Sequence, residues 1–120
     1  YFDSPSLVAN EFKAIFNFKK EFFIAFYLDT VNKVIAREII SIGTLNSALV
    51  HPREVFKNAI VRSANTIILA HNHPSGSLVP SEEDLHINKM LVEAGQLLGI
   101  KVLDNLIITE KGHYSIIEKI

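Results

Sequence analysis

Two uninterrupted apolar runs, Phe22–Leu28 and residues 66–70, constrain the fold of this chain more than any other feature. Each has the length of a strand, far short of the roughly twenty residues that a membrane span requires. The first is aromatic and aliphatic without a gap, and the second is rich in β-branched residues, so both are typical of buried strands. A chain of 120 residues that is 48% hydrophobic has the size of one domain. We therefore expect a single α/β domain, residues 1–120, with a mixed sheet packed between helices.

The other elements follow from periodicity and from turn residues. Apolar spacing predicts a helix from Ser4 to about Lys20, a second beginning at His51 and Pro52, and a long third helix after Ser81, closed by Gly99. Three further strands are expected: 34–42, which forms a hairpin with Phe22–Leu28, then 102–109 and 114–117. The predicted order is helix, strand, strand, helix, strand, helix, strand, strand.

Composition and charge exclude several classes of function. The chain has no cysteine, so disulfides, thiolate nucleophiles and sulfur-ligated zinc are excluded, and a metal would need histidine and carboxylate ligands. Twelve basic and thirteen acidic residues give a formal charge of −1, so nucleic-acid binding by a strong overall field is not expected. With neither a membrane span nor a signal peptide evident, we expect a cytoplasmic protein that makes no membrane contact. Because the first residue is Tyr1 and not methionine, we also expect a longer parent chain.

One stretch of fourteen residues contains a candidate metal site. His71 and His73 are two residues apart at the end of a strand, so their imidazoles can face the same side. A loop bounded by Pro74 and Pro80 returns the chain to Asp84, in the first turn of the next helix. Two histidines and one aspartate would leave the fourth position of a tetrahedral Zn²⁺ open, as in catalytic zinc sites.

The same residues also fit a purely structural interpretation. Ser81 followed three residues later by Asp84 is a good helix start, with the serine as N-cap and the acid in the first turn. The two interpretations are compatible, because a capping serine and a metal ligand can occupy the same helix start.

The motif resembles a known signature. His-x-His, seven intervening residues and Ser-x-x-Asp is similar to the motif of the JAMM (MPN+) metalloproteases, with 74–80 as the seven residues. The segments 42–45, 51–56, 68–76 and 99–104 resemble the bacterial RadC-like branch of that superfamily. The resemblance covers the chain from about Phe23 onward and implies a cytidine-deaminase-like (JAB/MPN) fold.

The resemblance also implies roles for individual residues. His71, His73 and Asp84 would bind one Zn²⁺ per chain, and Ser81 would help to hold the polarised carbonyl oxygen. The family also has a glutamate that shuttles a proton for the attacking water; we assign this role to Glu38, with Glu54 as the alternative.

Two functions remain open at this point. The first is a zinc-dependent hydrolase that cleaves a peptide or isopeptide amide bond in a peptide or modified-protein substrate. The second is a DNA-repair-associated accessory module with a structural or vestigial metal, as the traditional label of RadC-like proteins implies. Many such proteins have a helix-hairpin-helix segment that would precede Tyr1, and we do not expect this domain alone to bind nucleic acid. The oligomeric state is left open, because the fourth and fifth strands could offer an edge for self-association as a homo-oligomer.

Overall fold

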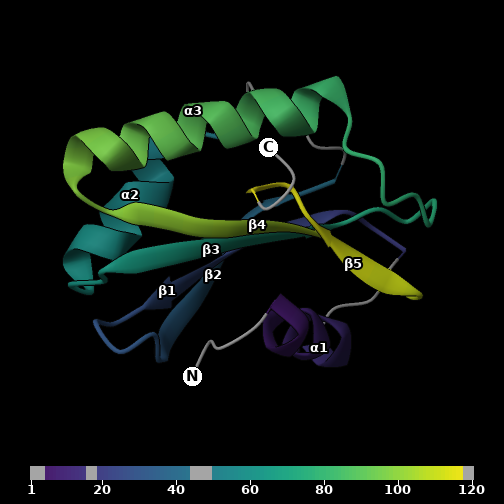
Figure 1. The fold of residues 1–120 in the computed structure, drawn as a ribbon, viewed down its shortest axis with the longest axis horizontal. Coiled ribbons are helices and arrows are strands. Elements are labelled where there is room, and N and C mark those ends of the chain that lie inside the picture. The colour runs from purple at the N-terminus through teal and green to yellow at the C-terminus, as the bar shows by residue number, and fades with distance from the viewer. Residues whose placement is uncertain (1–4, 16–18, 44–49, 118–120) are drawn as a thin grey trace.

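The computed structural model describes residues 5–15, 19–43 and 50–117. Its elements are α1 (Pro5–Ile15), β1 (Phe22–Leu28), β2 (Val34–Ile42), α2 (Pro52–Val61), β3 (Thr66–Asn72), α3 (Glu82–Leu98), β4 (Lys101–Thr109) and β5 (Gly112–Ser115) (Figure 1). Among the described helices, none is both long enough and apolar enough to cross a membrane.

The five strands form one mixed sheet in the order β2-β1-β3-β4-β5. β1 and β2 are the predicted hairpin, and the Asp29 carboxylate closes their turn by accepting bonds from the Val31 and Lys33 amides, each at 2.9 Å. β3 pairs antiparallel with β1 and parallel with β4, and α3 makes the crossover between the two parallel strands. Such a crossover places the end of β3 and the start of α3 at the same edge of the sheet.

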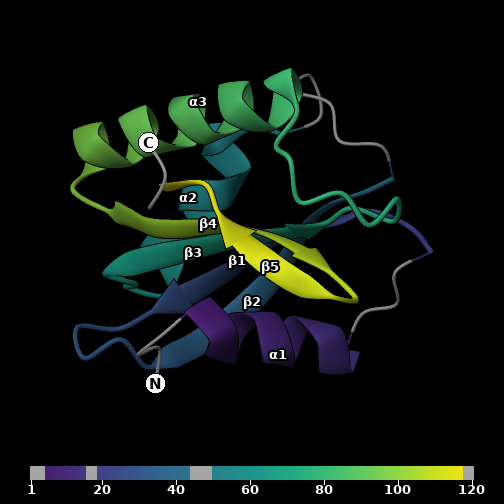
Figure 2. The same ribbon diagram turned by 45° about the vertical axis from the view of Figure 1, so that its right-hand side comes forward.

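Helices cover both faces of the sheet, as the two views show (Figures 1 and 2). On one face, α2 and α3 pack through Phe56 and Leu91 against the β1 side chains that include Tyr27. On the other face, α1 packs through Phe12 against Phe26 and its neighbours. The predicted α/β class, with a mixed sheet between helices, is confirmed.

Element boundaries differ from the predictions by more than one residue at three places. The third strand continues past residue 70 to Asn72, and the last strand spans Gly112–Ser115, not 114–117. The first helix ends within the described residues at Ile15, short of Lys20, and the predicted cap Ser4 lies outside the described residues. The helix start at Ser81 and the left-handed C-cap at Gly99 (φ 71°) are confirmed.

Gly95 allows α3 to lie close to the strand that follows it. A Cβ at this position would overlap the carbonyl oxygen of Ile100, which is backbone and cannot swing away. We expect Gly95→Ala to lower the free energy of unfolding by about 3 kcal/mol, the upper range for overpacking a core. Urea unfolding would measure the loss. Gly112→Ala is the matched control, because a Cβ there would meet no atom within 4 Å; equal losses in both variants would contradict the account.

The contribution of the Tyr27 hydroxyl to the free energy of unfolding should depend on pH. This hydroxyl donates a 2.8 Å bond to the Val55 carbonyl, and burial raises the pKa of this phenol to about 12. The folded state therefore favours the neutral phenol. This contribution is complete below the unfolded pKa of about 10 and is lost as pH rises toward the folded pKa. Tyr27→Phe should cost about 1 kcal/mol at pH 8 and less at pH 11, by urea unfolding at both values. An unchanged difference would contradict this.

Candidate metal centre

The end of β3 presents two histidines on the same side of the sheet. The strand extends through Asn72, and the His73 amide continues the pattern by donating to the Ile108 carbonyl at 3.1 Å. Side chains alternate along a strand, so His71 and His73 project to the same face. Their ring centroids are 5.1 Å apart. His71 is 2% exposed, so its ring lies at the inner side of the pair.

The start of α3 brings a carboxylate to these two rings. Ser81 caps the helix: its hydroxyl accepts from the Asp84 amide at 3.0 Å, and its own amide donates to Asp84 Oδ2 at 2.8 Å. The reciprocal bonds are a capping box, which fixes the side chain of the third helical residue as well as the helix start. Asp84 is therefore buried, and the backbone at the helix start orients its carboxylate without the help of a ligand.

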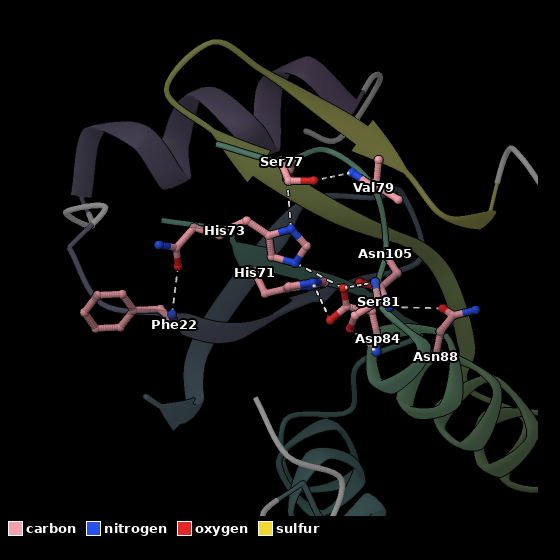
Figure 3. Close-up of polar contacts among 10 residues, drawn as sticks. Phe22, His71, His73, Ser77, Val79, Ser81, Asp84, Asn88 and Asn105 are labelled. Carbon is pink, nitrogen blue, oxygen red and sulfur yellow. Dashed lines mark hydrogen bonds and ion pairs between the residues drawn. The ribbon is translucent and has the colours of Figure 1, made fainter. Parts of the chain in front are cut away.

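The three side chains meet in one cluster (Figure 3). Nε2 of His71 lies 3.2 Å from Asp84 Oδ1, and Nε2 of His73 lies 3.0 Å from Asp84 Oδ2. Each residue offers one ligand atom, and the three atoms lie within 4.8 Å of one another. The structure thus brings together all three residues that the sequence predicts as ligands, in a group that could hold a metal ion.

The loop after β3 sets the orientation of the His73 ring. Gly76, with φ 86°, turns the chain so that the Ser77 carbonyl lies 2.8 Å from His73 Nδ1. A carbonyl can only accept, so Nδ1 carries the proton and Nε2 faces the carboxylate. That carboxylate is also an acceptor, so a cation, either a proton or a metal, must lie between it and Nε2. The hydrogen bond with Asp84, opposed by burial, accordingly raises the pKa of His73.

The charge balance of the cluster fits a divalent cation. Burial alone would raise the pKa of Asp84, but the neighbouring imidazoles of His71 and His73 outweigh it and hold this pKa well below its usual range. Asp84 is thus ionised beside two rings. Within the described residues, Nδ1 of His71 is buried without a hydrogen-bond partner, and its buried Nε2 has only the 3.2 Å contact with Asp84 Oδ1. Buried polar atoms without partners are costly, and a metal ion would satisfy Nε2.

A cleft of about 730 Å³ opens onto the cluster. His73, Ser81 and Asp84 line it together with Gly43 and Glu21, which immediately precedes β1. The negative charge of Glu21 also contributes to the raised pKa of His73. Glu21 is therefore an acidic side chain at the site that the sequence analysis did not select.

The structure does not bring Glu38 or Glu54 to this cleft. Glu38 lies on the edge strand β2 and forms a 2.8 Å ion pair with Arg62. Glu54 is exposed in the first turn of α2, 3.5 Å from Arg53. Neither lines the cleft. The strand glutamate was predicted without knowledge of the pairing register, which places Glu38 opposite Ala25 and two strands away from β3.

Fold and site together define a class of protein: a mixed-sheet α/β domain with two histidines and an aspartate, a group that could hold a metal ion, at the carboxyl end of an inner strand. The family model for the RadC-like JAB domain matches residues 2–120. The chain belongs to this family.

Relatives with substantial identity support the assignment. The chain is 54% identical over 117 residues to a UPF0758 protein of Alkaliphilus metalliredigens, covering 98% of this chain and 49% of that protein. It is 59% identical over 103 residues to a UPF0758 protein of Caldanaerobacter subterraneus subsp. tengcongensis (79% and 44%). It is 51% identical over 98 residues to one of Methanosarcina mazei (82% and 43%). The chain thus spans about half the length of these curated relatives, whose shared name states no activity.

Proposed function

We propose that this domain is a zinc-dependent hydrolase that cleaves an amide bond, in a peptide or in an isopeptide linkage. The observation that carries the proposal is the convergence of His71, His73 and Asp84 on one point beneath an open cleft. Three protein ligands leave one coordination position for a water or a substrate, which distinguishes catalytic from structural zinc. A Zn²⁺ ion held there would supply Lewis acidity and lower the pKa of a bound water toward neutrality.

Glu21 is the general acid and base in this proposal, in place of Glu38. Its support is its position, since it lines the same cleft as two of the three ligands, His73 and Asp84. A carboxylate there can accept a proton from the attacking water and return it to the leaving amine.

Ser81 would stabilise the carbonyl oxygen of the substrate. Its Oγ already accepts the Asp84 amide as the helix cap. A serine hydroxyl can accept one bond while it donates another, so the cap does not prevent the O–H from donating to an oxyanion in the cleft. The structural and the functional interpretations of Ser81 are in this way both satisfied.

Cleavage of a defined peptide mixture tests the proposal. The zinc-loaded protein would be incubated with a synthetic library of linear and lysine-branched peptides, and new termini detected by mass spectrometry. We expect cleavage that a zinc chelator abolishes and that added zinc restores. Binding of zinc without cleavage of either peptide type would contradict the hydrolase, and cleavage unaffected by the chelator would contradict the role of zinc.

A further inference from the structure

Asn72, between the two predicted zinc ligands, contacts the segment that contains Glu21. Its Nδ2 donates to the Lys20 carbonyl at 2.7 Å, and its Oδ1 accepts from the Phe22 amide at 2.7 Å. In Figure 3, a dashed line at the labelled Phe22 marks the bond that its amide donates. The two bonds bracket Glu21, whose carbonyl also accepts from the Gly43 amide at 2.8 Å.

The register of β1 and β3 explains why such a contact is needed. Their ladder ends at the pair Phe23 and His71. Continuing the register would place Glu21 opposite His73, but backbone pairing does not extend that far. The side-chain amide of Asn72 replaces the missing ladder bonds, because it offers a donor and an acceptor as a peptide group does. Side chains alternate along an extended chain, so Glu21 then shares the face of Phe23, the face on which His71 and His73 lie.

The Asn72 side chain is fully buried, and its polar atoms bond the chain on either side of Glu21. The residue is 0% exposed on a strand whose other residues from 67 to 70 are apolar. Asparagine is depleted in strands, and a buried amide is tolerated only when it is hydrogen-bonded. Both of its polar atoms are used on the chain at Lys20 and Phe22.

We propose that Asn72 is a positioning residue that holds Glu21 at the metal centre. The inference rests on the proposed function and adds to it the device that aligns the general base. A β3 strand with alanine at this position could still present His71 and His73, but the chain on either side of Glu21 would lose two of its anchors. Metal binding and positioning of the base are therefore separable in this protein.

Paramagnetic NMR of the Co²⁺-loaded protein tests this directly. Pseudocontact shifts of the backbone carbonyl carbons report position relative to the metal. In wild type, the Glu21 carbon should show a large shift. In Asn72→Ala it should fall by about twofold or more as the support is lost, while shifts at Ile67 and Leu69 stay constant. Co²⁺ affinity should change by less than about tenfold, because no ligand is removed.

Two further variants keep the outcome clear. Asn72→Asp retains the acceptor for the Phe22 amide but not the donor to Lys20, so an intermediate Glu21 shift is expected; it also serves if Asn72→Ala does not fold. Tyr27→Phe loses a buried hydrogen bond near the far end of β1, the strand that Glu21 precedes, and should leave the Glu21 shift unchanged. Unchanged Glu21 shifts in both Asn72 variants would overturn the positioning role alone. If neither Asn72 variant bound Co²⁺, Asn72 would be needed for metal binding itself, and the positioning role would be overturned. A wild type that binds no Co²⁺ would refute the proposed function as well.

Discussion

His73→Ala should lower the affinity for Zn²⁺ by at least about 100-fold, more than the loss of a residue that only supports a ligand. The reason is geometric: Nε2 of His73 lies 3.0 Å from Asp84 Oδ2, and its ring is oriented by the Ser77 carbonyl. The affinity would be measured by competition with a chromophoric chelator at alkaline pH, because the pKa of the His73 ring is raised.

His86→Ala is the matched control for this measurement. His86 lies two residues beyond Asp84 on α3, is exposed, and does not belong to the cluster. Its replacement should leave zinc affinity unchanged within about threefold, since helical residues two apart do not share a face. Equal affinities in wild type and His73→Ala would show that the zinc binds elsewhere.

Glu21→Gln should reduce amide hydrolysis by about 10² to 10⁴-fold, the usual contribution of a general acid and base. Glutamine keeps the size of the side chain and one acceptor oxygen, but it cannot take up a proton at neutral pH. Zinc affinity should change little, because Glu21 lines the cleft and is not one of the clustered ligands. The assay is cleavage of the peptide library by equal amounts of zinc-loaded wild type and variant.

Glu38→Gln is the control for Glu21→Gln, because Glu38 is the residue that the sequence predicts as the general acid and base. Glu38 pairs with Arg62 on the surface, and an exposed pair of this kind is worth about 1 kcal/mol of stability at most. The variant should hydrolyse like wild type. If Glu38→Gln were inactive and Glu21→Gln active, the assignment from the cleft would be wrong and the sequence prediction right.

Much of the fold could be predicted from the sequence because its signals are local. The run Phe22–Leu28 and the apolar stretch Val34–Ile42 match β1 and β2 as observed. Ser81 and Gly99 mark the ends of α3 through cap chemistry that depends only on neighbouring residues. The motif itself is also local: His71, His73 and Asp84 lie within fourteen residues, and a strand end, a turn and a helix start are enough to bring them together.

The position of the acidic residue could not be predicted in this way. It depends on the register between β1 and β3, two strands separated by 37 residues of chain between Leu28 and Thr66. The one available signal was that Glu21 stands two residues before Phe23, so it shares a face with that residue if the strand is continued. Without the pairing of Phe23 with His71, that face could not be related to the histidines.

Buried polar contacts were also beyond prediction, for the same reason. Asp104 stands in the largely apolar strand β4, and nothing local in the sequence assigns it a partner. In the structure its carboxylate accepts from the Ser115 hydroxyl at 2.5 Å and links β4 to the end of β5. Asn72 is similar, since its partners Lys20 and Phe22 are about fifty residues away in sequence.

The proposed function requires one Zn²⁺ ion to bind where β3 ends and α3 begins. Anomalous scattering at the zinc edge from crystals of the zinc-loaded protein tests it most directly. We expect one strong peak per chain, about 2.0 to 2.2 Å from Nε2 of His71, Nε2 of His73 and a carboxylate oxygen of Asp84. A fully loaded protein whose anomalous peak lies away from these three residues would contradict it.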